Sequence, residues 1–158
     1  AELENVAMPG YANHSIWRRT LEYDPKNYDL ALIQLTTPSR LEFYRGKQWI
    51  EISAQLSHAE LSEYDKRYWK FYYENIYNDK MGDVDEDMAI TGIRDHFAVA
   101  KIPCIIVTSE KYTRSKKFDI NLWDTNFPLD NTRHPSDIGH RIISKRILSY
   151  YETIISGM

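Results

Sequence analysis

The side chain best suited to chemistry is His134, which ends an acidic, turn-rich segment and precedes a long stretch of helical apolar periodicity. Asp130 and Asn131 stand shortly before it, and a carboxylate or an amide can orient an imidazole ring. A histidine held in this way can take a proton from a serine hydroxyl and return it to the leaving group. The segment therefore predicts a general base, unless His134 only caps the helix.

Two further polar segments follow apolar runs. Gly10 follows the run 3–8, where a small residue lets the backbone approach a ligand and donate an N–H to an oxyanion. The segment 36–40, Thr-Thr-Pro-Ser-Arg, follows the apolar run 28–35. Open α/β sheets place ligands where buried strands end. Both segments therefore predict binding groups, with a simple turn as the alternative for Gly10.

The composition limits the classes of protein. The 158 residues predict a single domain, 1–158, that is long enough to bury a core. A net charge of −3 without a basic run argues against nucleic acid as a partner, and the pair Arg18-Arg19 is expected on a solvated face. No apolar run reaches membrane-spanning length, so no membrane partner is expected. The single cysteine, Cys104, argues against disulfides and slightly favours the cytoplasm. The histidines lack metal-ligand spacing, and no metal is expected.

Strand and helix patterns alternate along the chain. Helices are predicted from Asn13 to about Glu22, within 57–101 with one start near Val84, and over 135–155. Strands buried on both faces are predicted at 28–35 and 102–108, a short strand at 3–8, and a long loop at 109–131. Because no hairpin signal interrupts this order, it predicts a three-layer α/β/α fold with a parallel sheet. The predicted buried face of the last helix comprises Ile138, Ile142, Ile143, Ile147, Leu148 and Tyr151.

Two segments in the helical middle have more than one interpretation. Tyr64, Tyr68 and Tyr72 recur every four residues, which indicates either ordinary helix packing or a stacking surface for a sugar or a protein. The acidic segment 82–87 resembles a calcium loop, but Ala89 and Arg94 stand where the loop requires its glycine and its bidentate glutamate. The acids are instead expected in the first turn of a helix.

Three blocks of the chain resemble the SGNH (GDSL-type) hydrolase family. They are Asn5-Val6-Ala7-Met8-Pro9-Gly10, the strand from Asp29 to Leu35 with its polar exit, and His134-Pro135 followed by Gly139-His140. The resemblance covers most of the chain and implies a flavodoxin-like, three-layer α/β fold. It also implies hydrolysis of a small-molecule or glycan ester by a Ser-His-Asp type of site, without a metal or an organic cofactor.

The chain departs from the family pattern at the groups that carry the chemistry. The family's serine block is absent before Asn5, and Pro38, which has no N–H, stands in place of the oxyanion asparagine. Asn131 stands where the family has an aspartate, with Asp130 as the alternative orienting group. Ser39 is the serine that merits a test as a replacement nucleophile.

A branch of SGNH-like proteins common in phage and marine-microbial sequences resembles the chain more closely. The matching residues are Gly10, Asn13, Ile16, Thr37, Arg40 and Glu42. In that branch the polar groups after the strand are rearranged, which implies that Asn13, Thr37 or Arg40 supplies the donor that Pro38 lacks. A surface ion pair between Arg40 and Glu42 is the alternative role of those two side chains.

Two interpretations of the missing serine stay open. The chain is either the carboxyl-terminal part of a longer hydrolase, inactive as given, or a non-catalytic SGNH-like module that binds a glycan or a protein. Both leave the strand 29–35 without the family's central strand beside it, and unpaired sheet edges are unfavourable. We therefore expect the strand at Asn5 to pair directly with the strand at Asp29, or the gap to be filled by exchange between chains in a homo-oligomer.

Overall fold

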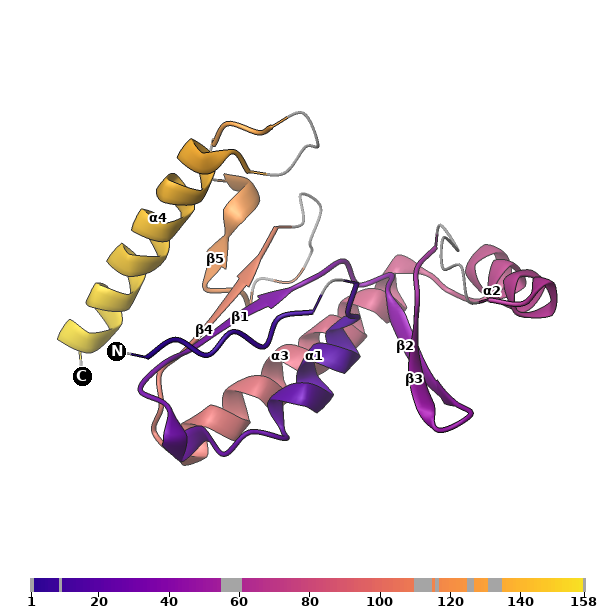
Figure 1. The fold of residues 1–158 in the computed structure, drawn as a ribbon, viewed down its shortest axis with the longest axis horizontal. Coiled ribbons are helices and arrows are strands. Elements are labelled where there is room, and N and C mark those ends of the chain that lie inside the picture. Colours follow the sequence, from indigo (N-terminus) through magenta and orange to yellow (C-terminus); the bar gives the residue numbers. More distant parts are fainter. Residues whose placement is uncertain are drawn as a thin grey trace.

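The computed structural model describes residues 2–8, 10–54, 61–109, 115, 117–124, 127–130 and 135–157 (Figure 1). Nine helices and strands are labelled in chain order: α1 (Asn13–Thr20), β1 (Ala31–Leu35), β2 (Leu41–Arg45), β3 (Gln48–Ile52), α2 (Glu63–Asn75), α3 (Asp79–Val99), β4 (Cys104–Thr108), β5 (Ile120–Asn121) and α4 (Asp137–Ser156). Short 3-10 turns lie at Pro25–Asn27 and Leu122–Asp124.

A parallel sheet in the order β1-β4-β5 lies between two helical layers. β1 pairs with β4 from Ala31 opposite Cys104 to Leu35 opposite Thr108, and β5 adds to β4 on the other side. α1 and α3 lie on one face of the sheet and α4 lies on the other (Figure 1). The prediction of an α/β fold with a parallel sheet between helices is confirmed. The flavodoxin-like and SGNH-like topology stays a prediction, because the described sheet has three strands.

The first core cluster joins the sheet to α3. Leu35, Ile90, Ile93 and Ile106 have no exposed surface, and Phe97 lies beside them at 4% exposure. Fully burying an aliphatic or aromatic side chain stabilises a fold by roughly 1.5–3 kcal/mol. This cluster therefore fixes the sheet against α3, and Ile16 and Trp17 of α1 pack at its margin.

The second core cluster joins the sheet to α4. Ile105 and Val107 of β4 pack against Ile143, Ile147 and Tyr151, all predicted on the buried face of the helix. The predicted face was too wide, since two of its members are exposed to solvent: Ile138 by 63% and Leu148 by 55%. At 3.6 residues per turn, both lie away from the row centred on Ile147.

One carboxylate connects the three layers. Asp119 accepts hydrogen bonds from Arg94 of α3 at 2.9 Å, Tyr150 of α4 at 2.9 Å and the N–H of Ile106 in β4 at 2.7 Å. It directly precedes β5, so the prediction of an uninterrupted loop over 109–131 was wrong. A two-residue strand has too little apolar periodicity to be recognised in the sequence.

A hairpin contradicts the prediction that the chain has none. β2 and β3 pair antiparallel from Leu41 opposite Ile52 to Arg45 opposite Gln48. The connection is Gly46-Lys47, with φ of 59° and 76°. Two consecutive residues with positive φ form the type I′ turn, whose twist matches a two-residue hairpin. The signal was missed because lysine is uncommon in the second position of this turn.

The segment Glu2–Met8 contradicts the prediction of a strand at Asn5. Its residues are exposed and form no strand, so they do not pair directly with the strand at Asp29. β1 is also not buried on both faces, because Leu32 is 49% exposed. α4 covers β4 and β5 but does not extend over Leu32. Among the described residues, β1 therefore has one strand neighbour and one open edge.

The helical middle consists of two helices. Ser62 and Asp65 form a reciprocal capping box at the start of α2, and Asn78 caps α3 by accepting the N–H of Met81. α3 therefore begins at Asp79, earlier than the predicted start near Val84, and Glu86 lies inside it, fully buried. The acids of 83–87 are thus not first-turn residues.

Candidate functional site

The start of α1 and the polar segment that follows β1 meet at one edge of the sheet. Because β1, β4 and β5 are parallel, they all end at this edge, at Leu35, Thr108 and Asn121. α4 begins beyond β5, and the start of α1 is bonded to the residue that follows β1. The carboxyl edge of a parallel sheet is where α/β proteins place their ligands.

Asn13 joins the start of α1 to the exit of β1. Its Oδ1 accepts the N–H of Thr36 at 2.8 Å, and its Nδ2 donates to the carbonyl of Thr36 at 3.1 Å. The side chain is only 4% exposed. The side-chain carbonyl and one N–H of Asn13, a predicted donor, are therefore bonded to the backbone of Thr36, and Asn13 positions the loop that follows β1.

The loop after β1 is a compact turn. The N–H of Arg40 donates to the carbonyl of Thr37 at 3.2 Å, and the hydroxyls of Thr37 and Ser39 are 3.2 Å apart. Tyr73 of α2 donates its hydroxyl to the carbonyl of Ser39 at 2.7 Å, and burial raises the pKa of this tyrosine well above its usual value. Hydrogen bonds within the turn and from Tyr73 of α2 therefore fix the conformation of this loop.

A small hollow lies between this loop and the helices. It is lined by Asn13, His14, Pro38, Arg40, Leu41, Asp85 and Glu86. Two predicted site residues, Asn13 and Arg40, are thereby brought together. The sequence did not indicate His14, Asp85 or Glu86, because their separation along the chain hides their proximity. The cavity volume is about 10 Å³, which is room for roughly one water molecule. In this conformation the hollow does not admit a substrate.

A shallower depression lies beside the hollow at the start of α3. Its volume is about 360 Å³, and it is lined by Asn78, Lys80, Met81, Val84 and Asp85. Asp85 belongs to both spaces, so they adjoin. The depression is open to solvent and follows the first turns of α3.

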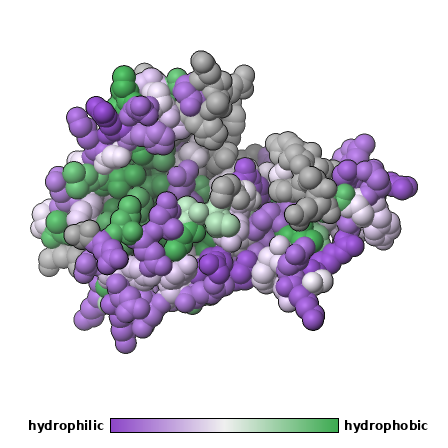
Figure 2. All heavy atoms as spheres, in the orientation of Figure 1, coloured by the Kyte–Doolittle hydropathy of each residue, from purple (hydrophilic) through white to green (hydrophobic). Residues whose placement is uncertain are grey.

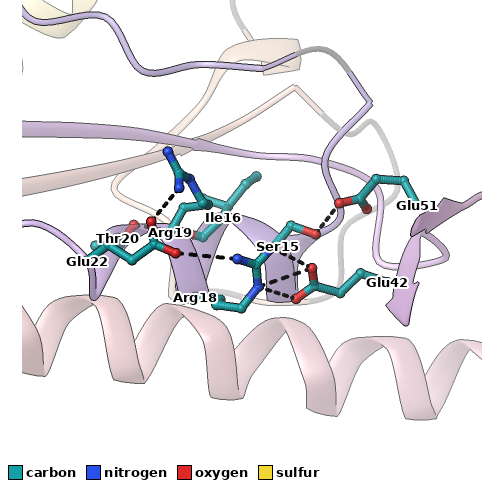
Figure 3. Close-up of polar contacts among 8 residues, drawn as sticks. All are labelled: Ser15, Ile16, Arg18, Arg19, Thr20, Glu22, Glu42 and Glu51. Carbon is teal, nitrogen blue, oxygen red and sulfur yellow. Dashed lines mark hydrogen bonds and ion pairs between the residues drawn. The ribbon is translucent and has the colours of Figure 1, made fainter. Parts of the chain in front are cut away.

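Polar contacts connect α1 to the hairpin (Figure 3). Arg18 donates from Nη2 to Glu42 at 2.9 Å and from Nε at 3.2 Å, and its guanidinium lies 4.3 Å from the ring centre of Trp49. The ion pair proposed for Arg40 and Glu42 is replaced by this one, and Arg18 is not simply solvated. Hairpin pairing brings Glu42 to α1, which the sequence alone did not show.

Glu51 makes a second connection to α1 from the same face of the hairpin. It accepts the hydroxyl of Ser15 at 2.5 Å and the N–H of Ala12 at 2.9 Å (Figure 3 shows the Ser15 contact). Burial raises the pKa of Glu51, and these two hydrogen bonds act in the opposite direction. Ser15 is fully buried in this contact with the hairpin.

Two further predicted site residues, Gly10 and Asp130, do not line the hollow. Gly10 has φ of +87°, a left-handed conformation that favours glycine, shortly before α1. Asp130 is exposed and follows Leu129, which forms a bridge with Pro135; the N–H and hydroxyl of Ser136 both donate to the carbonyl of Pro128 at 3.0 Å. His134 and Asn131 lie outside the described residues.

Comparison with known proteins adds no relative. No family model matches the chain, and neither a curated protein nor a solved structure is significantly similar to it. Within the described residues, no His, Cys, Asp and Glu side chains gather as a metal-binding group. None of the helices in that part of the chain has the length and apolar character needed to cross a membrane.

Proposed function

We propose that the carboxyl edge of the sheet binds the substrate of an SGNH-like ester or acyl hydrolase. His134 acts as the general base, and Asp130 or Asn131 orients it. The observation that supports this proposal is the pairing of Asn13 with Thr36, which joins two of the polar segments at one edge.

In this proposal the described residues bind and position the ester. Arg40, which lines the hollow, and the N–H of Gly10 stabilise the developing oxyanion, because fixed donors and positive charge favour that state. Thr37 shapes the turn that presents Arg40. The adjoining depression with Met81 and Val84 accommodates the apolar part of the substrate.

The nucleophile is a separate question. No Gly-Asp-Ser sequence occurs in the 158 residues. Across the described ranges, no hydrogen bond joins a serine hydroxyl to an imidazole, and Ser39 contacts Thr37 instead. We therefore expect the chain by itself to hydrolyse p-nitrophenyl acetate no faster than buffer.

The decisive experiment combines sequencing with an activity assay. If the coding sequence ahead of Ala1 supplies a Gly-Asp-Ser block, the joined polypeptide should hydrolyse p-nitrophenyl acetate. His134→Ala should then lower kcat by about 10³-fold or more, since the base and the nucleophile act as a unit. His140→Ala, an exposed histidine on α4, is the matched control and should retain activity. An upstream sequence without such a block, or activity that survives His134→Ala, contradicts the hydrolase proposal.

A glycan-binding module is the second candidate, and one observation favours it. Tyr64, Tyr68 and Phe71 recur on one face of α2 and are 75%, 56% and 57% exposed. Exposed aromatic rings can stack on sugars. Titration with soluble oligosaccharides should then perturb the NMR signals of α2, and Tyr68→Ser should weaken binding while Tyr44→Ser, exposed on the hairpin, should not. Equal effects of the two variants would exclude α2 as the binding face.

A further inference from the structure

The first turn of α1 lacks a cap of its own. Its N-cap residue is Ala12, and neither a side-chain cap nor an acidic residue in the first turn is present. Alanine is a poor N-cap, whereas serine, threonine, aspartate and asparagine are preferred because their side chains accept a free N–H of the helix. A helix of eight residues is also too short to be stable by itself in water. The start of α1 therefore depends on groups from other parts of the chain.

Glu51 of β3 provides the carboxylate that this turn lacks. In a capping box, the acid at the third helical position accepts the N–H of the N-cap residue. Ser15 occupies that position in α1, and Glu51 accepts the N–H of Ala12 at 2.9 Å in its place. The hydroxyl of Ser15 donates to the other oxygen of Glu51 at 2.5 Å, as Figure 3 shows. A carboxylate 36 residues beyond Ser15 thus stabilises the amino end of α1, where negative charge is favourable.

The two contacts of Glu51 lie on either side of Asn13. Ala12 and Ser15 are fully buried, and Asn13 between them is 4% exposed. The amide of Asn13 both accepts from and donates to the backbone of Thr36, the residue that follows β1. It can form both hydrogen bonds in only one orientation, which requires a fixed backbone in the first turn of α1. The effect of Glu51 on Thr36 therefore passes through α1.

The hairpin is not joined to α1 through either core cluster, since neither described cluster includes a residue of β2 or β3. Figure 2 shows the largest apolar area between α4 and the α1–α3 layer, away from the hairpin. Glu42 stands directly opposite Glu51 in the hairpin, but it bonds to Arg18, more than one helical turn beyond Asn13. Glu51 is thus the hairpin carboxylate that acts on the first turn.

We propose that Glu51 is a positioning residue of the site at the carboxyl edge of the sheet. It fixes the first turn of α1 and, through Asn13, the loop that follows β1. Its importance for an ester substrate rests on the proposed function, in which Arg40 of this loop stabilises the oxyanion. The positioning itself is measured without a catalytic assay, so its failure is distinguishable from the failure of the hydrolase proposal.

The test is hydrogen exchange by NMR at the Thr36 amide, which donates to Asn13. Glu51→Ala should accelerate this exchange by about 10- to 100-fold, because hydrogen bonds to a charged acceptor no longer oppose local opening. Glu51→Gln keeps an acceptor for the N–H of Ala12 and should retain most of the protection.

Glu42→Ala is the matched control, because it removes the other hairpin carboxylate that bonds to α1. Exchange at Ile106, whose amide is bonded in the core, reports global opening and should rise in both alanine variants. Exchange at Thr36 should rise in Glu51→Ala alone. A role for Glu51 in overall stability only would not produce this difference between the two variants.

A second variant covers the case in which Glu51→Ala does not fold. Ser15→Ala removes one donor to Glu51 with a small change in side-chain volume, and it should also accelerate exchange at Thr36, by less than Glu51→Ala. The proposal is overturned if exchange at Thr36 is as slow in Glu51→Ala as in Glu42→Ala. Where Glu51→Ala does not fold, the same result for Ser15→Ala overturns it.

Discussion

Truncation of Asn13 should loosen the edge of the sheet that carries the proposed site. Asn13→Ala removes the two hydrogen bonds to the backbone of Thr36, at 2.8 and 3.1 Å, from a side chain that is 4% exposed. A buried backbone group left without a partner costs about 1–3 kcal/mol. Since Thr36 is partly buried, water satisfies part of this loss. We expect the free energy of unfolding to fall by about 2–4 kcal/mol.

Urea unfolding followed by tryptophan fluorescence measures this change. In thermal unfolding the same loss corresponds to about 4–16 °C in Tm for a chain of this size. Asn27→Ala is the matched control, because Asn27 is exposed beyond α1, and it should change the free energy by less than about 0.5 kcal/mol. If Asn13→Ala is as stable as Asn27→Ala, Asn13 does not hold the loop after β1, and the argument that it joins the polar segments is wrong.

Three further predictions follow from the polar and buried groups. The side chain of Glu42 is only 6% exposed, so Glu42→Gln should lower the free energy of unfolding in urea by about 1–3 kcal/mol. Glu22→Gln, at a side chain that is 46% exposed, should change this free energy by less than about 0.5 kcal/mol. Equal effects of the two variants would contradict a role for the Arg18–Glu42 pair. Burial raises the pKa of Glu51 above its ordinary 4.5, so its ionisation opposes folding. As the pH rises above about 4.5, the parent should lose stability relative to Glu51→Gln, and a parallel pH dependence of the two proteins would refute this. Burial raises the pKa of the Cys104 thiol to about 12, so at pH 8 the thiolate fraction is about 10⁻⁴ in the native protein, compared with about a quarter for an unperturbed thiol. Labelling by Ellman's reagent should therefore be at least about 10²-fold slower in the native protein than in urea. Similar rates would show that the thiol is accessible in the native protein.

The sequence predicted the elements that bury a continuous apolar row. β4 and the buried row of α4 were predicted because Ile105, Val107, Ile143 and Ile147 repeat at strand and helix periods. The hairpin was missed because its turn, Gly46-Lys47, depends on a positive φ at a lysine. The exposure of Leu32 was missed because an apolar run does not reveal how far a helix on the next layer extends.

The candidate site was predictable only in part. Asn13 and Arg40 were named through the resemblance to the SGNH-like branch, and they line one hollow. The functions of Arg18 and Ser15 were not predictable, because their partners Glu42 and Glu51 reach α1 only after the hairpin has folded. Carboxylates that act across such distances leave no local pattern in the sequence.

The hairpin and α2 are attached to the rest of the molecule differently from the helices that cover the sheet. Neither described core cluster includes a residue of β2, β3 or α2, and the links from α1 to the hairpin are the charged and polar contacts of Glu42 and Glu51. Salt screens exposed charges over a Debye length of about 8 Å, but it screens a carboxylate as buried as Glu42, whose side chain is 6% exposed, much less. The hairpin is therefore attached to α1 by directional contacts of buried carboxylates, and loss of one partner should weaken this attachment more than added salt does.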